Sequence, residues 1–143
     1  MSYCMIIPGT KNVEVDFSAI KAKLKDQGYI FDYYTEYDSI GDEWDHRILT
    51  NKIGANLAHI TKEDRKSDFF NKGRINNLRN VIKEKINADN VWLNRFINRI
   101  QVVYFFNVFT KDCNSENIDL INKIGHIISE LTEGIILVDG LIL

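Results

Sequence analysis

The sequence is poor in cysteine and has no long apolar segment. Its only cysteines, Cys4 and Cys113, lack the paired spacing of a zinc site or a redox motif, so both are expected to be reduced thiols. The longest apolar runs, such as GIILV and VVYFF, are far shorter than the ~20 residues needed to cross a bilayer. The N-terminal segment lacks the basic and apolar regions of a signal peptide. These features predict a cytoplasmic protein that does not enter membranes.

The sequence also lacks the motifs of the common enzyme classes. Its glycines are dispersed, in PGT, IGD, IGAN, KGR, IGH and EGI, and no cluster of them could cradle a phosphate. Binding sites of the P-loop or dinucleotide type are therefore disfavoured. No nucleophile stands beside a recognisable general base. We expect a protein that is not an enzyme and that needs no cofactor and no metal.

The composition is that of an ordinary folded protein. Of the 143 residues, 45% are hydrophobic and 27% are charged, which excludes a disordered or fibrous chain. A chain of this length can bury a core without a disulfide or a metal. The sequence predicts one globular domain over residues 1–143.

Local patterns in the first third of the chain predict a strand, a helix and a strand. Residues 2–8 alternate as a strand, which Pro8-Gly9 closes as a turn. A helix follows from a cap at Asp16 or Ser18 to Gly28, a residue suited to the left-handed conformation that ends helices. Residues 29–34 then form a second strand.

The middle of the chain has helical spacing. From Asp42 to Ile60 the apolar residues recur at intervals of three and four, which predicts a helix. Residues 74–87 and 90–100 show the same spacing and predict two further helices. Together these segments form a helical insertion between the strands.

The last third of the chain predicts a strand, a helix and a hairpin. Residues 101–109 are dense in β-branched and aromatic side chains, as in a central strand. A helix is expected from about Ser115 to Thr132, and Asp139-Gly140 joins two apolar runs as in a type I′ hairpin. The predicted fold is α+β or α/β, with helices packed on a mixed sheet of four or five strands and a C-terminal β-hairpin.

An acidic and aromatic segment follows the second predicted strand. The stretch IFDYYTEYDSIGDEWDHR, residues 30–47, holds six carboxylates among large aromatic residues, and its first basic residue is Arg47. Interfaces are rich in tyrosine and tryptophan, and clustered carboxylates speed association with a basic partner. We call residues 32–45 the acidic strip. The residues predicted to bind a partner are Asp32, Tyr34, Glu36, Tyr37, Asp38, Asp42, Glu43, Trp44 and Asp45.

Three other interpretations of polar residues are weaker. On a helix, Asp42, Asp45 and His46 would share one face and could bind a metal with Asp38, but the spacing matches neither a calcium loop nor a histidine-glutamate zinc motif. Acids in a first helical turn are expected for dipole reasons alone. Acid and base catalysis by two of these carboxylates would require burial that raises one pKa. A catalytic role for His59, expected on the same helix, or for His126 is also disfavoured.

Charge is unevenly distributed along the chain. Residues 30–61 carry −4 and residues 62–111 carry +6, within a net charge of −2. The basic middle, with Phe69, Phe70 and Trp92 interleaved, suggests a nucleic-acid-binding module. However, its positive charges recur on polar helix faces, and the whole chain is acidic, so direct binding of nucleic acid is disfavoured.

By overall profile the chain resembles small bacterial immunity proteins paired with polymorphic or contact-dependent inhibition toxins. The acidic strip and the lack of other motifs carry this resemblance. It implies an inhibitor that binds one cognate toxin domain, such as a basic nuclease, with carboxylates in the place of substrate phosphates. The competing interpretation is a small enzyme or ligand-binding domain. Its site would lie at the C-terminal ends of the strands, near residues 32–40 and 107–114.

Overall fold

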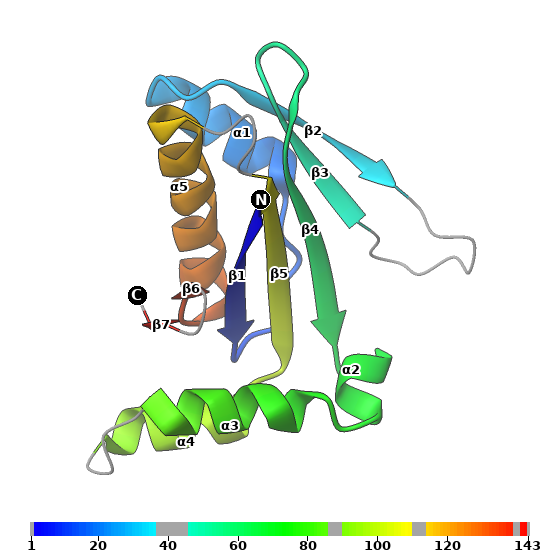
Figure 1. Ribbon diagram of the computed structural model, residues 1–143, viewed down its shortest axis with the longest axis vertical. Coiled ribbons are helices and arrows are strands. Elements are labelled where there is room, and N and C mark those ends of the chain that lie inside the picture. The colour runs from blue at the N-terminus through cyan, green and yellow to red at the C-terminus, as the bar shows by residue number, and fades with distance from the viewer. Residues whose placement is uncertain (1, 37–45, 86–89, 110–113, 139–140, 143) are drawn as a thin grey trace.

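The protein, described here from a computed structural model, is an α+β domain built on one sheet (Figure 1). The structure describes residues 2–36, 46–85, 90–109, 114–138 and 141–142. The strands are β1 (Ser2–Gly9), β2 (Phe31–Glu36), β3 (His46–Asn51), β4 (Asn56–Asp64), β5 (Val102–Phe109), β6 (Leu137–Val138) and β7 (Leu141–Ile142). The helices are α1 (Phe17–Asp26), α2 (Asp68–Asn71), α3 (Ile75–Lys85), α4 (Val91–Arg99) and α5 (Ser115–Thr132).

The sheet has seven strands in the order β2-β3-β4-β5-β1-β6-β7, and neighbouring strands in this order pair antiparallel. The expected mixed sheet of four or five strands is therefore wrong in both respects. The two helical crossovers do join strands that run the same way. However, three strands separate β1 from β2, and β1 separates β5 from β6. Parallel strands are thus never neighbours in the described sheet.

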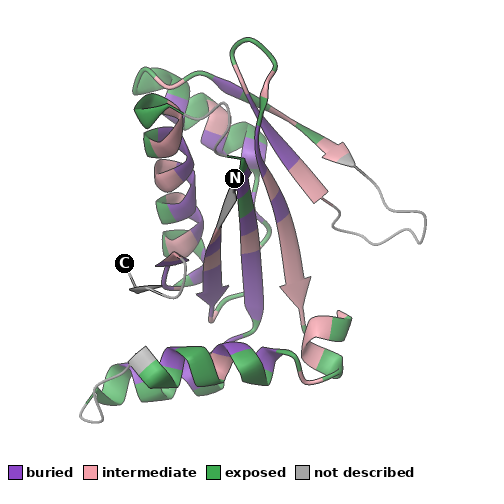
Figure 2. Cartoon of the chain, in the orientation of Figure 1, coloured by how far each residue is buried: buried purple, intermediate pink, exposed green. Residues whose placement is uncertain are grey.

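Side chains from the two faces of the sheet enter two separate cores. Met5, Ile7, Tyr104 and Phe106 belong to the core to which α1 and α5 contribute, on one face of the sheet (Figure 1). The alternate residues point the other way, so that Ile6, Val103 and Phe105 pack against α3 and α4 across one end of the sheet. Figure 2 shows buried residues along β5, the strand predicted to be central.

The helix signals in the sequence are confirmed where a capping residue defines the boundary. The carboxylate of Asp16 accepts hydrogen bonds from the backbone N–H groups of Ser18 and Ala19, at 2.9 and 3.2 Å. Gly28 follows α1 with φ of +91°. The α5 helix spans Ser115–Thr132, as predicted, and Asn114 caps it. Within the described chain, no helix is long and apolar enough to cross a bilayer.

The helix predicted over residues 42–60 is wrong. The described part of this range is the hairpin of β3 and β4, so His46 and His59 lie on strands, where their rings stack 4.5 Å apart. Asn51 closes the turn, because its side-chain oxygen accepts from the N–H groups of Ile53 and Ala55. Gly54 supplies the positive φ, +85°, that this turn requires.

A β-bulge explains why this hairpin imitates a helix in sequence. The strand register shifts between Leu49 and Thr50, and the extra residue on β4 allows both Leu57 and Ala58 to be fully buried in one core. On β3, Ile48 and Leu49 are both buried although they point to opposite faces. Because neighbouring residues are buried in pairs, the apolar spacing loses the period of two that marks a strand.

The predicted C-terminal β-hairpin is confirmed. Leu137 pairs with Ile142 and Val138 pairs with Leu141, so β6 and β7 are direct neighbours. The predicted turn residues, 139–140, lie outside the described residues. The hairpin extends the sheet beyond β1, since β6 pairs with Met5 and Ile6.

Candidate binding surfaces

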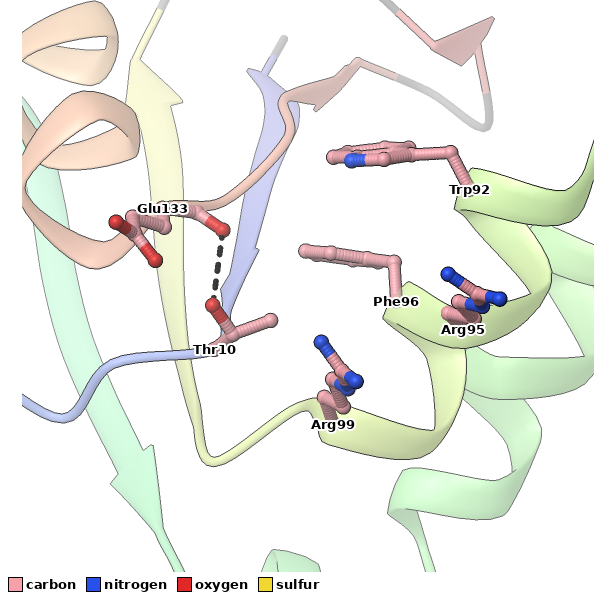
Figure 3. Close-up of a pocket in the computed structure, with 6 residues that line it drawn as sticks. All are labelled: Thr10, Trp92, Arg95, Phe96, Arg99 and Glu133. Carbon is pink, nitrogen blue, oxygen red and sulfur yellow. Dashed lines mark hydrogen bonds between the residues drawn. The ribbon is translucent and has the colours of Figure 1, made fainter.

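A cavity of about 320 Å³ lies between α4 and the segments that follow β1 and α5 (Figure 3). Its lining comes from three parts of the chain: Trp92, Arg95, Phe96 and Arg99 of α4, Thr10 after β1, and Glu133 after α5. We call it the α4 pocket. Its volume lies at the lower end of the range of about 300 to 1,000 Å³ that small-molecule sites occupy.

Two stacked aromatic rings form one side of the α4 pocket. Trp92 and Phe96 are four residues apart on α4, and their ring centroids lie 5.4 Å apart with an interplanar angle of 16°. Phe96 is 3% exposed and belongs to the core, whereas Trp92 is 59% exposed. The buried phenyl ring therefore holds the indole in place while much of the indole surface stays open to solvent (Figure 3).

Two arginines give the α4 pocket a positive charge. Arg95 and Arg99 are exposed on α4, and among the described residues neither guanidinium forms an ion pair. The carboxylate of Glu133 is 3.1 Å from the ammonium of Lys11, so it is compensated by a different residue. The local charge of the pocket is therefore positive although the net charge of the chain is −2.

The opposite wall of the pocket is fixed by backbone contacts. The N–H groups of Thr10 and Lys11 both donate to the carbonyl of Thr132 at 2.9 Å, and the Thr10 hydroxyl donates to the Glu133 carbonyl at 3.2 Å (Figure 3). Gly134 packs so closely on β1 that a Cβ there would lie 2.4 Å from the Pro8 carbonyl oxygen. The Thr10 hydroxyl and the Glu133 carbonyl are thus joined to each other on a wall that backbone hydrogen bonds fix.

The wall also contains an unusual backbone conformation. Glu133 is the one non-glycine residue with positive φ, 49°, in the described part of the chain. It ends α5 in the left-handed conformation that glycine usually supplies. A left-handed residue with a side chain costs about 1–2 kcal/mol. The sequence therefore keeps a costly residue where its carbonyl lines the pocket.

The structure describes only the start of the predicted acidic strip. The carboxylate of Asp32 is 3.1 Å from the ammonium of Lys21 and accepts from the N–H of Tyr33 at 2.8 Å. These two hydrogen bonds, the backbone one first, hold the pKa of Asp32 below its usual value. Glu36 ends β2 opposite His46. The remaining predicted residues lie outside the described residues: Tyr37, Asp38, Asp42, Glu43, Trp44 and Asp45.

The strip begins at a partly open face of the sheet. One row of paired residues crosses five strands there, through Tyr34, Ile48, His59, Asn107 and Cys4. Tyr34 is 43% exposed, and Phe109, on the same side of β5 as Asn107, is 41% exposed. We call this row, with Phe109, the open sheet face. It presents two separate aromatic side chains to solvent, and the described residues of the acidic strip lie on β2 at its edge.

The described parts of the two segments predicted for a competing enzyme site do not form a shared crevice. Residues 32–36 belong to β2 and residues 107–109 to β5, and these strands run in opposite directions with two strands between them. Their C-terminal ends therefore lie at opposite ends of the sheet. Among the described residues, no three histidine, cysteine, aspartate or glutamate side chains are placed to hold a metal ion.

A second cavity, of about 360 Å³, lies between α3 and the sheet. Its lining is mainly apolar, from side chains such as Leu78 and Val81 of α3 and Ile6 and Phe105 of the sheet. Few polar groups are present to orient a ligand, so this cavity indicates no particular chemistry.

Sequence reasoning missed the α4 pocket. In the sequence, Trp92 lies in a basic segment whose positive charges recur on polar helix faces, which predicts solvated side chains and no pocket. The spacing of Trp92, Phe96 and Arg99 places them on one face of a helix, and that signal was available. Nothing local links them to Thr10 and Glu133, which are distant in sequence. Family models, curated proteins and solved structures were all compared with the chain, and none matches.

Proposed function

We propose that the protein is an immunity-type inhibitor that binds and neutralises a basic toxin domain through the acidic strip and the open sheet face. The observation that carries this proposal is the position of the strip. Its described residues, Asp32 to Glu36, lie on β2, which is an edge strand in the order of the described sheet, and the ring of Tyr34 is exposed there. A rigid strand with an open edge is a surface on which another protein can dock.

Charge supports a basic partner. Residues 30–61 carry −4, and five of the six carboxylates of the strip follow Tyr34 in sequence. Asp32 already has Lys21 as a partner, so the attraction is assigned to the later carboxylates. Clustered charges of one sign accelerate association with an oppositely charged surface, and an exposed aromatic ring then supplies contact area. Carboxylates can take the place of phosphates in the site of a basic nuclease.

Protection of growing cells tests this function. The proposal predicts a toxin domain encoded beside this gene, and cells that express that domain are expected to survive when the protein is co-expressed. A triple variant with Asp38, Asp42 and Asp45 changed to lysine is expected to lose protection. The control reverses three exposed acids elsewhere, Asp26→Lys, Glu84→Lys and Glu130→Lys, which changes net charge equally. Failure of the unchanged protein to protect, or equal loss in both variants, contradicts the proposal.

In this proposal the protein acts by binding the toxin domain and has no catalytic activity of its own. A screen of hydrolase and transferase substrates with the purified protein is expected to give no turnover. Turnover that disappears when Asp38, Asp42 or His46 is replaced would instead make the strip an active site and favour the enzyme interpretation.

A further inference from the structure

From the α4 pocket we infer a second binding site, for a nucleotide unit whose base stacks on Trp92 and whose phosphate is held by Arg95 and Arg99. This inference does not depend on the proposed inhibitor function, because it uses a different surface. The shared ligand chemistry is a planar base joined to a phosphate, which either a free nucleotide or a single-stranded nucleic acid can supply.

The aromatic side of the pocket suits a base. The indole of Trp92 is 59% exposed, yet its position is fixed by the stack on Phe96, with 5.4 Å between centroids. Figure 3 shows the two rings nearly parallel. A fixed and exposed ring is the platform on which bases stack in proteins that bind single strands, and every base can use it.

The arginines suit a phosphate. Arg95 and Arg99 are four residues apart on α4, so they project from adjacent positions of one helix. A guanidinium matches phosphate oxygens with two parallel N–H donors. In the described part of the chain no carboxylate forms an ion pair with either arginine. Both therefore remain available to an anionic ligand.

The opposite wall suits the sugar or the exocyclic groups of a base. Thr10 and Glu133 line the pocket, and the hydroxyl of Thr10 donates to the Glu133 carbonyl, so that each oxygen keeps a lone pair that can accept a further hydrogen bond. A ribose hydroxyl or an exocyclic amine can donate to them. The left-handed backbone of Glu133 helps to place this carbonyl.

A nucleotide explains the set of groups better than an acidic peptide does. A carboxylate-rich peptide would use Arg95 and Arg99 but would leave the exposed indole without a function. A nucleotide uses the ring, the cations and the acceptors together, and a volume of about 320 Å³ is in the range of small-molecule sites.

Tryptophan fluorescence gives the direct test. The chain has two tryptophans, so a Trp44→Phe variant leaves Trp92 as the sole reporter. Titration with adenosine monophosphate is expected to quench Trp92, with weaker quenching by adenosine and none by inorganic phosphate. Calorimetric titration of the unmodified protein with the same compounds provides a second measurement that does not depend on the Trp44 substitution.

Variants separate the two halves of the site. Trp92→Ala is expected to weaken binding about tenfold or more, which is the range that stacking on an aromatic ring supplies. The double variant Arg95→Gln with Arg99→Gln is expected to weaken the binding of adenosine monophosphate at least about tenfold. The binding of adenosine should stay unchanged, because only the phosphate contacts charged groups. The matched control is Arg65→Gln with Lys66→Gln, which removes two exposed charges at the turn after β4.

An oligonucleotide of about eight residues identifies the source of the ligand, because single-stranded sites span about 4–16 nucleotides. Affinity at least tenfold above that of the mononucleotide indicates a strand, whereas equal affinity indicates a free nucleotide. The inference is overturned if neither ligand quenches Trp92 or releases heat at millimolar concentration. It is also overturned if the Arg95 and Arg99 variant binds as the control does, or if an acidic peptide competes equally and Trp92→Ala has no effect.

Discussion

The α4 pocket and the open sheet face differ in how their charges and rings are held. In the pocket, Arg95 and Arg99 lack an ion pair within the described chain, and Trp92 rests on a buried ring. On the sheet, the carboxylate of Asp32 is paired with Lys21. The hydroxyl of Tyr34 donates a long hydrogen bond, 3.4 Å, to the side-chain oxygen of Asn56 at the start of β4. The pocket thus places an exposed ring beside two cations that lack an ion pair in the described chain, whereas the described carboxylate on β2 is already paired.

The largest expected effect comes from removing the phenyl ring of Phe96, on which Trp92 stacks. Phe96→Ala should lower the free energy of unfolding by about 3–5 kcal/mol, because it leaves a cavity in the core. Tyr34→Ala, on the open sheet face, should cost less than about 1 kcal/mol. Urea unfolding of both variants measures the difference. Equal losses in the free energy of unfolding would contradict the difference in burial between the two rings.

Gly134→Ala should have the next largest effect. A Cβ at Gly134 would lie 2.4 Å from the Pro8 carbonyl oxygen, so the wall of the pocket must shift away from β1, at a cost of about 2–3 kcal/mol. Gly28→Ala is the control, since it has positive φ but no atom within 4 Å of the new Cβ. The control should cost about 1 kcal/mol, the lower end of the cost of a side chain in the left-handed conformation. A Gly134 variant no less stable than the control would contradict the close approach.

Glu133→Gly is expected to stabilise the protein slightly. Glycine removes the steric cost of a left-handed residue, and the lost pair with Lys11 is exposed and worth little. The net gain should be about 0.5 kcal/mol after the extra chain entropy of glycine. Thermal unfolding provides the measurement. A loss of stability would show that the Glu133 side chain has a structural role beyond its carbonyl.

The smallest effect concerns the paired carboxylate on β2. Lys21→Met should raise the pKa of Asp32, but the pKa should stay below its usual value because the Tyr33 N–H is the larger cause of the depression. Since folding lowers this pKa, the stabilising contribution exists above the unfolded pKa of about 3.9 and is lost as pH falls through the folded pKa. Titration by NMR tests this, with Lys23→Met as the control.

Local signals in the sequence predicted much of the fold. Asp16, Asn114 and Gly28 mark helix boundaries through hydrogen bonds or backbone angles that involve only neighbouring residues. The pairing of β6 with β7 follows from two adjacent apolar runs. Strand order and direction could not be predicted in this way, because they depend on contacts between residues far apart in the chain.

The wrong helix over residues 42–60 and the missed α4 pocket also have physical causes. The bulge at Leu57 buries consecutive residues and hides the strand period. In the pocket, the helical spacing of Trp92 and Phe96 was visible, but the hydrogen bond from Thr10 to Glu133 joins residues 123 positions apart. Long-range packing brings the end of α5 against the end of β1, and Arg95 and Arg99 line a cavity together with residues from these segments.

The proposed function predicts that a toxin domain is encoded beside this gene, and the rate of association with the product of that neighbouring gene tests the proposal most directly. The account predicts that reversal of Asp38, Asp42 and Asp45 slows association at least about tenfold at low salt, with a smaller difference as salt shortens the screening length from about 10 Å at 0.1 M to about 3 Å at 1 M. The Arg95→Gln and Arg99→Gln variant should associate at the unchanged rate. An unchanged rate for the strip variant, or a slowed rate for the pocket variant alone, would contradict the account.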